Sequence, residues 1–433
     1  MSPLKRTFLL FCCLVLACVI FYIYSQNRLE KIIIQIYKCD VGEEAQDTIT
    51  ALQGNKTFII SPYYDNRSGN QVRVLGIVHH TEVKALYCYF CCDGMKLYSV
   101  KATIDLHIDR FDFPFGLADI ICNVPSYCEA SHIHLAESPY VNVTLLPRFE
   151  IRNRKRTPFS ANFSVCLSTM YGNFSNALQF IQTMEMYKLL GAQRVTVYYI
   201  NCSDLVKEIL DYYSNEGTME VVPWPIHKYL RPSNSWYHKR GDNSDIGYYG
   251  QMTTLNDCIY KNMYRSKYVL LNDLDEIILP FEHQMWDSMM EKLEQEHPDV
   301  GAFLFESHNF PQSAVTDGIF PNVSSWKDVP GFNLLNHVHR EPDRPNVFNA
   351  RKMIVNPRKI IQTSVHSILK NLGKTLNVPL KIALVHHCRV PHQPHLKVSQ
   401  LISDRTIWRY HVSLISNVNR VLDQISSQRK AKT

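Results

Sequence analysis

The spacing of apolar and polar residues divides the chain into two regions that predict different kinds of sheet. In the first region, short runs of alternating apolar residues are separated by turn residues, which predicts antiparallel strands. In the second region, strand-like runs alternate with amphipathic helical segments, which predicts a mostly parallel sheet flanked by helices. The expected antiparallel strands are residues 57–64, 71–80, 83–92, 96–108 and 140–147. The expected α/β elements are strands at 163–169, 194–200, 219–223 and 267–271, and helices at 176–190, 203–213 and 252–264.

An uncharged apolar run, FLLFCCLVLACVIFYIY at residues 8–24, precedes both regions. As a helix it would span about 25 Å, which suits a thin, ER-like bilayer. The residues that follow it offer no small-x-small cleavage site, so we expect an uncleaved signal anchor rather than a signal peptide. This predicts a single-pass type II protein of the Golgi or ER membrane, with residues 1–7 in the cytoplasm and the rest in the lumen.

Cysteines and glycosylation sequons agree with a lumenal location. Of the thirteen cysteines, Cys12, Cys13 and Cys18 lie inside the apolar run, and the others would meet an oxidising compartment where disulfides form. We expect pairing within the first region among Cys88, Cys91 or Cys92, Cys122 and Cys128. Asn-x-Ser/Thr sequons begin at Asn55, Asn66, Asn142, Asn162, Asn173, Asn201 and Asn322. Together these features predict a membrane glycoprotein with disulfide bonds.

The domain organisation follows from the changes in pattern. We expect a stem at residues 25–50, a β-rich disulfide-containing domain at 51–150, an α/β catalytic domain at 157–400 and a C-terminal helical segment at 401–433. A basic run at 148–156 (RFEIRNRKR) is expected to mark the boundary between the two domains. With 433 residues and 45% hydrophobic content, the chain can form one large core or two ordinary ones. The net charge of +6 is spread out and gives no indication of nucleic-acid binding.

The candidate chemistry is concentrated at residues 270–280, LLNDLDEIILP. Asp273 and Asp275 follow an apolar strand and, if the chain stays extended, point to the same side. Acids also end strands simply because the chain meets water there, but the flanking residues 269–271 and 277–279 are too apolar for a solvated loop. Paired carboxylates at the carboxyl end of a buried strand suit a hard divalent cation. The sequence therefore predicts a metal site at this edge of the sheet.

Several common nucleotide and hydrolase motifs are absent from the sequence. There is no Gly-x-Gly-x-x-Gly fingerprint, no Gly-Lys-Ser/Thr phosphate loop and no Gly-x-Ser-x-Gly elbow. If the α/β domain binds a nucleotide phosphate, a metal ion must supply the positive charge that glycine-loop amides supply elsewhere.

Motifs from residue 160 to about 395 resemble glycosyltransferase family 92. These are VCLSTMYGN (165–173), GQMTTLNDCIY (250–260), KYVLLNDLDEIILP (267–280), RKMIVNP (351–357) and HHCRVP (386–391). The resemblance implies a GT-A fold and a metal-dependent galactosyltransferase that uses UDP-galactose and forms β1,4 linkages with inversion. One departure is Cys388, because the family pattern at the last motif is usually His-Tyr-Arg.

The resemblance also implies roles for particular residues. Mn²⁺ would be bound by Asp273, Asp275 and His387, with Asp275 the more direct ligand and Asp273 also suited to ribose, sugar or metal-bound water. His386 is the rival of His387, since alternation lets only one of the two face the site. Arg389 lies two positions on and would pair with a donor phosphate, although a surface ion pair would explain it equally well.

Inversion needs a general base to take the proton of the acceptor hydroxyl. Glu306, at the end of the apolar run 301–305, is the expected base, and the alternatives are Glu276, Glu341 and Asp343. Aromatic residues before residue 252 would suit stacking on uracil or on a sugar, and core packing would explain them as well; they are Trp224, Trp236, Tyr248 and Tyr249.

Together with the expected membrane anchor, the resemblance implies a Golgi galactosyltransferase that acts on a glycan of a glycoprotein or glycolipid. Two other classes of protein stay open. A type II membrane lectin or carbohydrate-binding module would keep the anchor, glycans and disulfides, and would need no convergence of Asp275, His387 and Arg389. A metal-dependent hydrolase would need an open, water-bearing site, usually with more histidine ligands.

Overall fold

A computed structural model describes residues 42–92, 96–316, 323 and 326–432. The expected cytoplasmic tail at 1–7, the expected membrane anchor at 8–24 and most of the expected stem lie outside these residues. Within the described part of the chain, no helix is long and apolar enough to cross a membrane.

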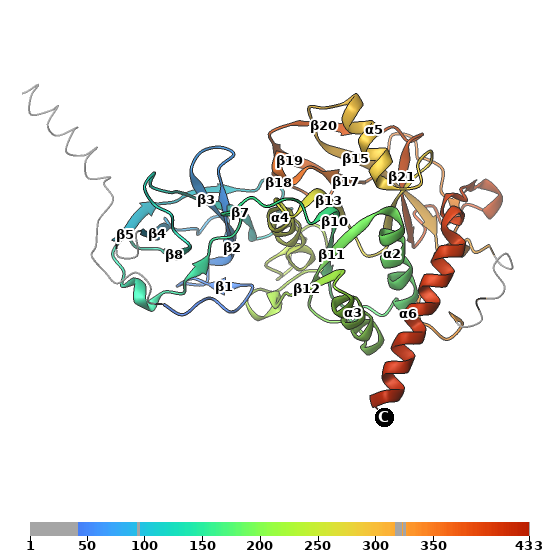
Figure 1. Cartoon of the computed structure of the whole chain (residues 1–433), viewed down its shortest axis with the longest axis horizontal. Helices are drawn as coiled ribbons and strands as arrows, with labels where there is room; N and C mark the ends of the chain where they lie inside the picture. The colour runs from blue at the N-terminus through green and yellow to red at the C-terminus, as the bar shows by residue number, and fades with distance from the viewer. Residues whose placement is uncertain (1–41, 93–95, 317–322, 324–325, 433) are drawn as a thin grey trace, which may run out of the picture.

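The first part of the chain forms two antiparallel sheets, which we call the β module (Figure 1). One sheet has the order β1-β2-β3-β7-β6 and the other has the order β5-β4-β8-β9. The strands of the first are β1 (Thr50–Ala51), β2 (Thr57–Asp65), β3 (Gln71–His79), β7 (Phe115–Asn123) and β6 (Thr103–Leu106). Those of the second are β5 (Lys96–Lys101), β4 (Tyr87–Cys92), β8 (His132–Ala136) and β9 (Phe149–Glu150).

Two disulfides join parts of the β module. Cys88 of β4 pairs with Cys122 of β7, which links the two sheets, and Cys92 pairs with Cys128. The expected pairing is therefore confirmed, with Cys92 rather than Cys91 in the bridge. The expected strand at 140–147 is wrong. This segment instead contains a short 3-10 helix, Val143–Leu145, because the side chain of Asn142 accepts a hydrogen bond from the backbone N–H of Thr144 and caps the turn.

The second part of the chain is an α/β domain built on a sheet of the order β12-β11-β10-β13-β17-β15-β21-β14, with β20 beside β15. Its strands are β12 (Met219–Pro223), β11 (Ala192–Tyr199), β10 (Ala161–Met170), β13 (Ser266–Asn272), β17 (Arg351–Val355), β15 (Val300–Pro311), β21 (Ala383–Arg389), β14 (Glu276–Pro280) and β20 (Lys374–Asn377). Two small ribbons pair β16 (His339–Arg340) with β22 (Ile402–Ser403), and β18 (Ile360–Thr363) with β19 (Ile368–Asn371).

The sheet is mixed, whereas the sequence predicted a mostly parallel one. Strands β12, β11, β10 and β13 are parallel as expected. Strand β17 runs antiparallel to both β13 and β15, and β14 runs antiparallel to β21. The expectation fails in this half because the described residues include no α-helix between β13 and β14 or between β15 and β17, and such helices were the basis for expecting parallel neighbours.

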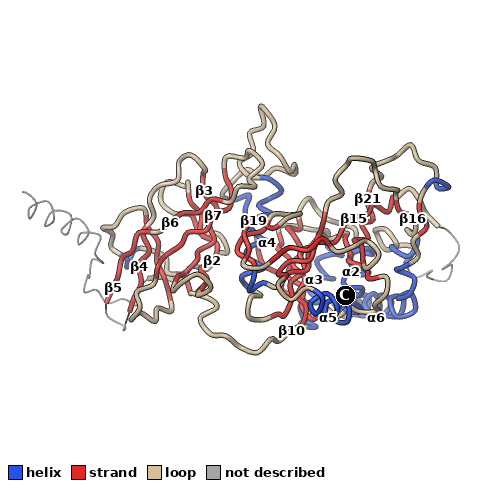
Figure 2. The backbone as a smooth tube through the Cα atoms, turned by 90° about the horizontal axis from the view of Figure 1, so that it is seen from above, coloured by secondary structure: helices blue, strands red, loops and turns tan. Residues whose placement is uncertain are grey.

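Helices cover the two faces of the sheet unequally. Helices α2 (Ala177–Leu190), α3 (Asp204–Glu216), α5 (Trp286–Glu296) and α6 (His411–Lys432) pack on one face, and Figure 2 shows them grouped on one side of the strands. Helix α4 (Gln251–Lys261) packs on the other face, together with residues of the β module. Alternation along β13 produces this division. Leu270 packs in the core under α2, α3, α5 and α6, and Val269 and Leu271 pack in the core under α4.

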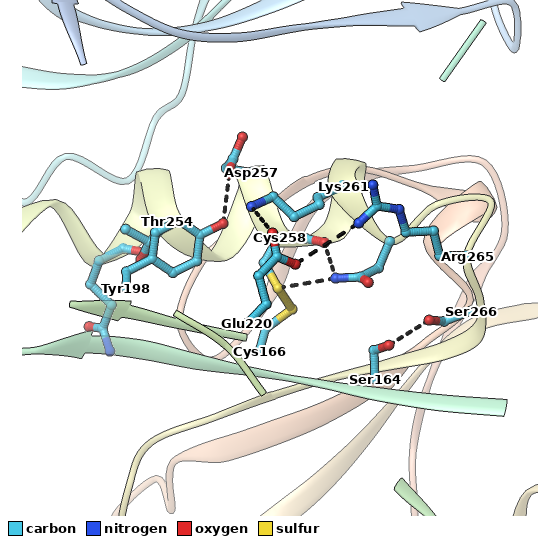
Figure 3. The surroundings of a disulfide bond; sticks show 12 residues. Ser164, Cys166, Tyr198, Glu220, Thr254, Asp257, Cys258, Lys261, Arg265 and Ser266 are labelled. Atoms are coloured by element: carbon cyan, nitrogen blue, oxygen red, sulfur yellow. Dashed lines mark hydrogen bonds and ion pairs between the residues drawn. A yellow bond between two sulfur atoms is a disulfide. The ribbon is translucent and has the colours of Figure 1, made fainter. Parts of the chain in front are cut away.

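Helix α4 is fastened to the sheet and to the β module. A disulfide between Cys166 of β10 and Cys258 holds it against the sheet (Figure 3). The buried carboxylate of Asp257 accepts hydrogen bonds from Tyr198 of β11 at 2.6 Å and from Tyr63 of the β module at 2.7 Å. The two parts of the chain therefore share a buried polar contact as well as an apolar core.

Candidate active site

A cavity of about 690 Å³ opens where β10 and β13 end. Its size is within the range of roughly 300–1,000 Å³ that is usual for small-ligand sites. Strands β15 and β21 and the loop at residues 341–350 contribute the facing wall. The lining residues that the following paragraphs use are Ser168, Tyr248, Gln251, Asp273, Asp275, Glu276, Ser307, His308, Asp343, Asn349, Val365, His387 and Arg389.

Asp275 and His387 meet at this cavity. His387 Nε2 lies 3.1 Å from Asp275 Oδ2, although 112 residues separate them in the sequence. The pairing of β14 with β21 brings them together, because Glu276, which directly follows Asp275, lies opposite His387 in the register. The Nδ1 atom on the other side of the ring lies 3.3 Å from Ser307 Oγ and 3.2 Å from Glu276 Oε1.

The charge state of His387 follows from these neighbours. Burial alone would lower the pKa of its imidazole, but the carboxylates of Asp275 and Glu276 outweigh burial and raise the pKa above its ordinary value. The ring is therefore held by acids on two sides. An oxygen and a nitrogen about 3 Å apart also match the spacing of neighbouring ligands on an octahedral ion with bonds of about 2.1 Å.

Asp273 lies in the site and is held by protein groups. Its Oδ1 accepts hydrogen bonds from Ser168 Oγ at 3.0 Å and Gln251 Nε2 at 2.9 Å, and its Oδ2 lies 2.7 Å from Lys352 Nζ. Burial favours the neutral acid, but the Lys352 ammonium, together with His366 and His387, lowers the pKa of Asp273 to about 2. Asp273 is therefore a carboxylate that is already paired with a cation.

Lys352 is a site residue that sequence reasoning missed. Its ammonium is buried between Asp273 at 2.7 Å and Glu276 at 3.0 Å. Burial by itself would lower the pKa of Lys352, but the two carboxylates raise it. The only signal in the sequence is a lysine directly before the apolar run Met353–Val355, within a motif that carries the family resemblance.

The neighbour His386 faces away from the cavity. It is fully buried, its ring stacks on Phe310 at 3.8 Å, and its Nε2 bonds the carbonyl of His337. Burial lowers its pKa to about 4, so the ring is neutral at physiological pH. Alternation along β21 thus places His387, and not His386, in the site.

The expected base Glu306 belongs to a separate cluster at the other side of the cavity. Its Oε1 accepts a hydrogen bond from Asn349 at 2.9 Å and lies 3.2 Å from His308 Nε2. Asn349 also donates to Asp343 at 3.3 Å. Asp343, His308 and Asn349 line the cavity, whereas Glu306 does not.

Within the residues that the structure describes, Glu306, His308 and Asp343 form the one group of three whose ligand atoms all lie within 4.8 Å of each other. Arg340 Nη1 lies 3.3 Å from His308 Nδ1 and would repel a cation there. Asp273, Asp275 and His387 do not form such a compact triple. The structure brings Asp275 and His387 together and leaves Asp273 with Lys352.

The remaining predicted residues differ in exposure. Arg389 is exposed on the cavity wall. Trp224 is part of the core and donates to the carbonyl of Tyr249. Tyr248 lines the cavity with a left-handed backbone (φ 40°), and Tyr249 adopts φ 53° and stacks on Tyr171 at 4.1 Å. Non-glycine residues in this conformation cost free energy and often occur at functional sites.

The α/β domain is similar to proteins of a known family. The model of "Glycosyltransferase family 92" matches residues 161–418, which contain the cavity and exclude the β module. The chain is 23% identical over 258 residues to "Beta-1,4-galactosyltransferase galt-1" of Caenorhabditis elegans, covering 56% of each chain. It is 25% identical over 224 residues to "Glycosyltransferase family 92 protein F13G3.3" of the same organism, covering 51% of this chain and 41% of that protein.

The matches thus span about half the length of these relatives. Among solved structures, S. aureus TarS 1-349 in complex with UDP is similar at 16% identity, with a TM-score of 0.25 over 45% of this chain and 47% of that chain. The family match covers more than half of the chain and contains every predicted site residue. The chain belongs to glycosyltransferase family 92.

Proposed function

We propose that this protein transfers galactose from UDP-galactose to a hydroxyl group of a glycan, with inversion and a β1,4 linkage, on a GT-A type domain. The observation that carries the proposal is the Asp275–His387 pair at the wall of a cavity of about 690 Å³. Membership of a glycosyltransferase family and the partial match to a galactosyltransferase support the reaction class and the sugar.

The residues present fit a divalent cation such as Mn²⁺. Asp275 and His387 offer an oxygen and a nitrogen at the spacing of neighbouring ligands, and both line the cavity. Carboxylate and imidazole are both acceptable ligands for Mn²⁺. A cation held there would neutralise the charge that develops on the departing diphosphate.

The other groups around the donor have distinct tasks. Asp273 is oriented by Lys352, Ser168 and Gln251, so we assign it to a hydroxyl of the donor or a metal-bound water rather than to a bare ion. Arg389, exposed on the cavity wall, would contact a donor phosphate through its guanidinium.

We assign the general base to the Glu306–Asp343 cluster. His308 and Asn349 contact both carboxylates and fix their positions. Glu306 is the base expected from the sequence. Asp343 competes for the role because it lines the cavity itself.

We further propose a location in the Golgi or ER membrane, with the apolar run at 8–24 as the anchor and the catalytic domain in the lumen. The three disulfides among the described residues support an oxidising compartment. Endoglycosidase treatment of the native protein should increase its electrophoretic mobility, and an unchanged mobility would count against a lumenal location.

The test of the activity is a donor screen with the purified full-length protein in detergent. Release of UDP from UDP-galactose, UDP-glucose and UDP-N-acetylglucosamine would be measured in the presence of mixed glycoprotein and glycolipid glycans and Mn²⁺. We expect UDP-galactose to be preferred and EDTA to stop its use. Glycan binding without consumption of any nucleotide sugar would instead indicate a lectin.

A further inference from the structure

A loop of the β module is joined to a loop of the α/β domain beside the catalytic cavity. The first loop, residues 107–114, connects β6 to β7, and the second, residues 231–250, lies between β12 and α4. The backbone N–H of His238 donates to the carbonyl of Phe111 at 2.9 Å, and that of Phe115 donates to the carbonyl of Asp245 at 3.0 Å. The two loops therefore form one continuous surface.

Close packing reinforces this junction. The ring of Phe113 is buried edge-on against His238, with ring centroids 5.2 Å apart. Gly247 approaches so closely that a Cβ atom there would lie 2.6 Å from a ring carbon of Phe113. No residue larger than glycine fits at position 247 without displacing Phe113. Because Phe113 belongs to the β module, the position of the second loop depends on that module.

Three aromatic rings stand at the outer side of the joined loops. Phe111 meets Trp236 edge to face, with centroids 5.7 Å apart, and Trp236 meets Tyr237 at 4.7 Å. Trp236 is 56% exposed and Tyr237 is 40% exposed. We call these three residues the aromatic platform. Core packing does not explain them, in contrast to Trp224, because rings that serve only the core are removed from water.

The aromatic platform is continuous with the catalytic cavity. A small groove is lined by Phe111 and Trp236 and also by Tyr248, Gln251 and Val365. The last three residues also line the catalytic cavity. Gln251 in addition donates to Asp273 in the site, so the groove reaches the donor-binding residues.

The chemistry of this surface suits a carbohydrate chain. A pyranose ring carries an apolar face of C–H groups and a rim of hydroxyl groups. Exposed Trp and Tyr rings provide rigid apolar area with a polar edge. Asp109 and Arg110 line the same groove and offer an acceptor and donors for hydroxyl groups.

We propose that the aromatic platform is a subsite for the acceptor, holding a sugar ring of the oligosaccharide at a distance from the hydroxyl that receives galactose. This inference rests on the proposed transferase function and deepens it. The β module, which lies outside the family match, thereby takes part in the choice of acceptor. A lipid surface would also contact exposed aromatic rings, but continuity with the catalytic cavity favours a glycan.

The test compares Trp236→Ala with Tyr140→Ala in the full-length protein. Tyr140 is a matched control, since it is an exposed aromatic residue of the β module (72% exposed) that lines neither the groove nor the cavity. Three properties are measured: binding to an array of oligosaccharides released from glycoproteins and glycolipids, acceptor-independent hydrolysis of UDP-galactose, and binding to phosphatidylcholine vesicles.

We expect Trp236→Ala to weaken glycan binding at least tenfold while hydrolysis of UDP-galactose stays within twofold of wild type, and Tyr140→Ala to change neither. Tyr237→Ala should show the same pattern as Trp236→Ala. Unchanged glycan binding in Trp236→Ala, absence of any array binding by the wild type, or a loss of vesicle binding alone would overturn the inference. A wild type that binds glycans through Trp236 but never hydrolyses UDP-galactose would support the subsite and refute the proposed donor.

Discussion

His387 Nε2 lies 3.1 Å from Asp275 Oδ2 because β14 and β21 pair with Glu276 opposite His387. The contact depends on strand register. A slip by one residue would turn His387 away from the cavity and present His386, which now packs on Phe310. The Asp275–His387 pair is thus positioned by the same hydrogen bonds that join β14 to β21.

The first prediction concerns the charge of Asp275. The change Asp275→Asn keeps the size of the side chain and removes the charge that would hold Mn²⁺. If the ion stabilises departing UDP, transfer of galactose should fall about a thousandfold or more, since each ~1.4 kcal/mol of lost transition-state stabilisation costs a factor of ten. The rate is measured by release of UDP, and added Mn²⁺ should restore EDTA-treated wild type but not the variant.

The control for this change is Asp299→Asn. Asp299 pairs with Lys374 on the surface, and its side chain is 76% exposed. The Asp299→Asn substitution should leave both the rate of galactose transfer and the thermal midpoint of unfolding unchanged. A folded Asp275→Asn protein with a near-normal transfer rate would refute the metal site proposed here.

Some of the site could be predicted from the sequence for clear physical reasons. Asp275 follows a strongly apolar strand and the acids stand together, so a carboxylate site at a strand end was expected. Strand alternation indicated that only one of His386 and His387 could face the site, and the family resemblance favoured His387. The first inference depends on short-range pattern and the second on the matching motif.

Lys352 could not be predicted in the same way. It reaches Asp273 and Glu276 only because β17 inserts antiparallel between β13 and β15. That pairing joins segments far apart in the sequence, and nothing near Lys352 indicates which strands will flank it. For the same reason, the sequence predicted parallel order correctly from β12 to β13 and missed the antiparallel half.

The β module shows the same limit. Its strands were expected from the apolar pattern and its disulfides from the cysteines, but its contact with the catalytic domain was not expected. Tyr63 reaches Asp257 across 194 residues, and Phe111 meets Trp236 across the junction of the loops. Long-range contacts of this kind leave no periodic trace in the sequence.

The second prediction is that Lys352→Met strongly destabilises the fold. The substitution would leave Asp273 and Glu276 beside each other without their buried counter-charge. Removing one partner from a buried ion pair typically costs about 3–5 kcal/mol. The matched control is Lys374→Met, which breaks an exposed pair with Asp299 and should cost about 0–1 kcal/mol. Urea unfolding measures both, and equal stability of the two variants would contradict the central role of Lys352.

The third prediction concerns stability in acid. Burial favours the neutral form of Asp65, but the Arg67 and Arg73 guanidinium groups, which bond it at 2.8 and 3.1 Å, lower its pKa from 3.8 to about 2. A lowered carboxyl pKa stabilises the fold at a pH above the ordinary value, and this stabilisation disappears as the pH falls through the folded-state pKa. Asp65 should therefore contribute about 2 kcal/mol at pH 7 that is lost between about pH 4 and 2.

Urea unfolding of wild type and Asp65→Asn at pH 7, 4 and 2.5 checks this contribution. The variant should be less stable at pH 7 and lose less stability than the wild type as the pH falls. Asp299→Asn should follow the wild-type curve. Parallel curves for wild type and Asp65→Asn would show that Asp65 is not the group responsible.

The fourth prediction concerns the disulfide that fastens α4 to β10. Cys166 and Cys258 are separated by 92 residues, so their bond restricts a long loop of the unfolded chain. The double change Cys166→Ala and Cys258→Ala should lower the free energy of unfolding by about 2–5 kcal/mol. Cys202→Ala is the control, since Cys202 takes part in no disulfide. A thermal midpoint shared by the double variant and wild type would argue against this role of the bond.

The last prediction separates the two candidates for the general base. Glu306 and Asp343 are held by the same side chain, Asn349, so either substitution disturbs the same local hydrogen bonds. Glu306→Gln and Asp343→Asn each remove a carboxylate and keep the shape of the residue. Loss of a general base should reduce kcat about 10²–10⁴-fold while binding of UDP, measured by calorimetry, stays at the wild-type value.

We expect this fall in kcat for Glu306→Gln and a smaller effect, mainly on KM for the acceptor, for Asp343→Asn. If Asp343→Asn shows the large fall and Glu306→Gln does not, Asp343 takes the proton directly from the acceptor and Glu306 serves to position His308. If neither variant lowers kcat tenfold, the base lies outside this cluster. Glu341, which also lines the cavity, is then the next candidate for the base.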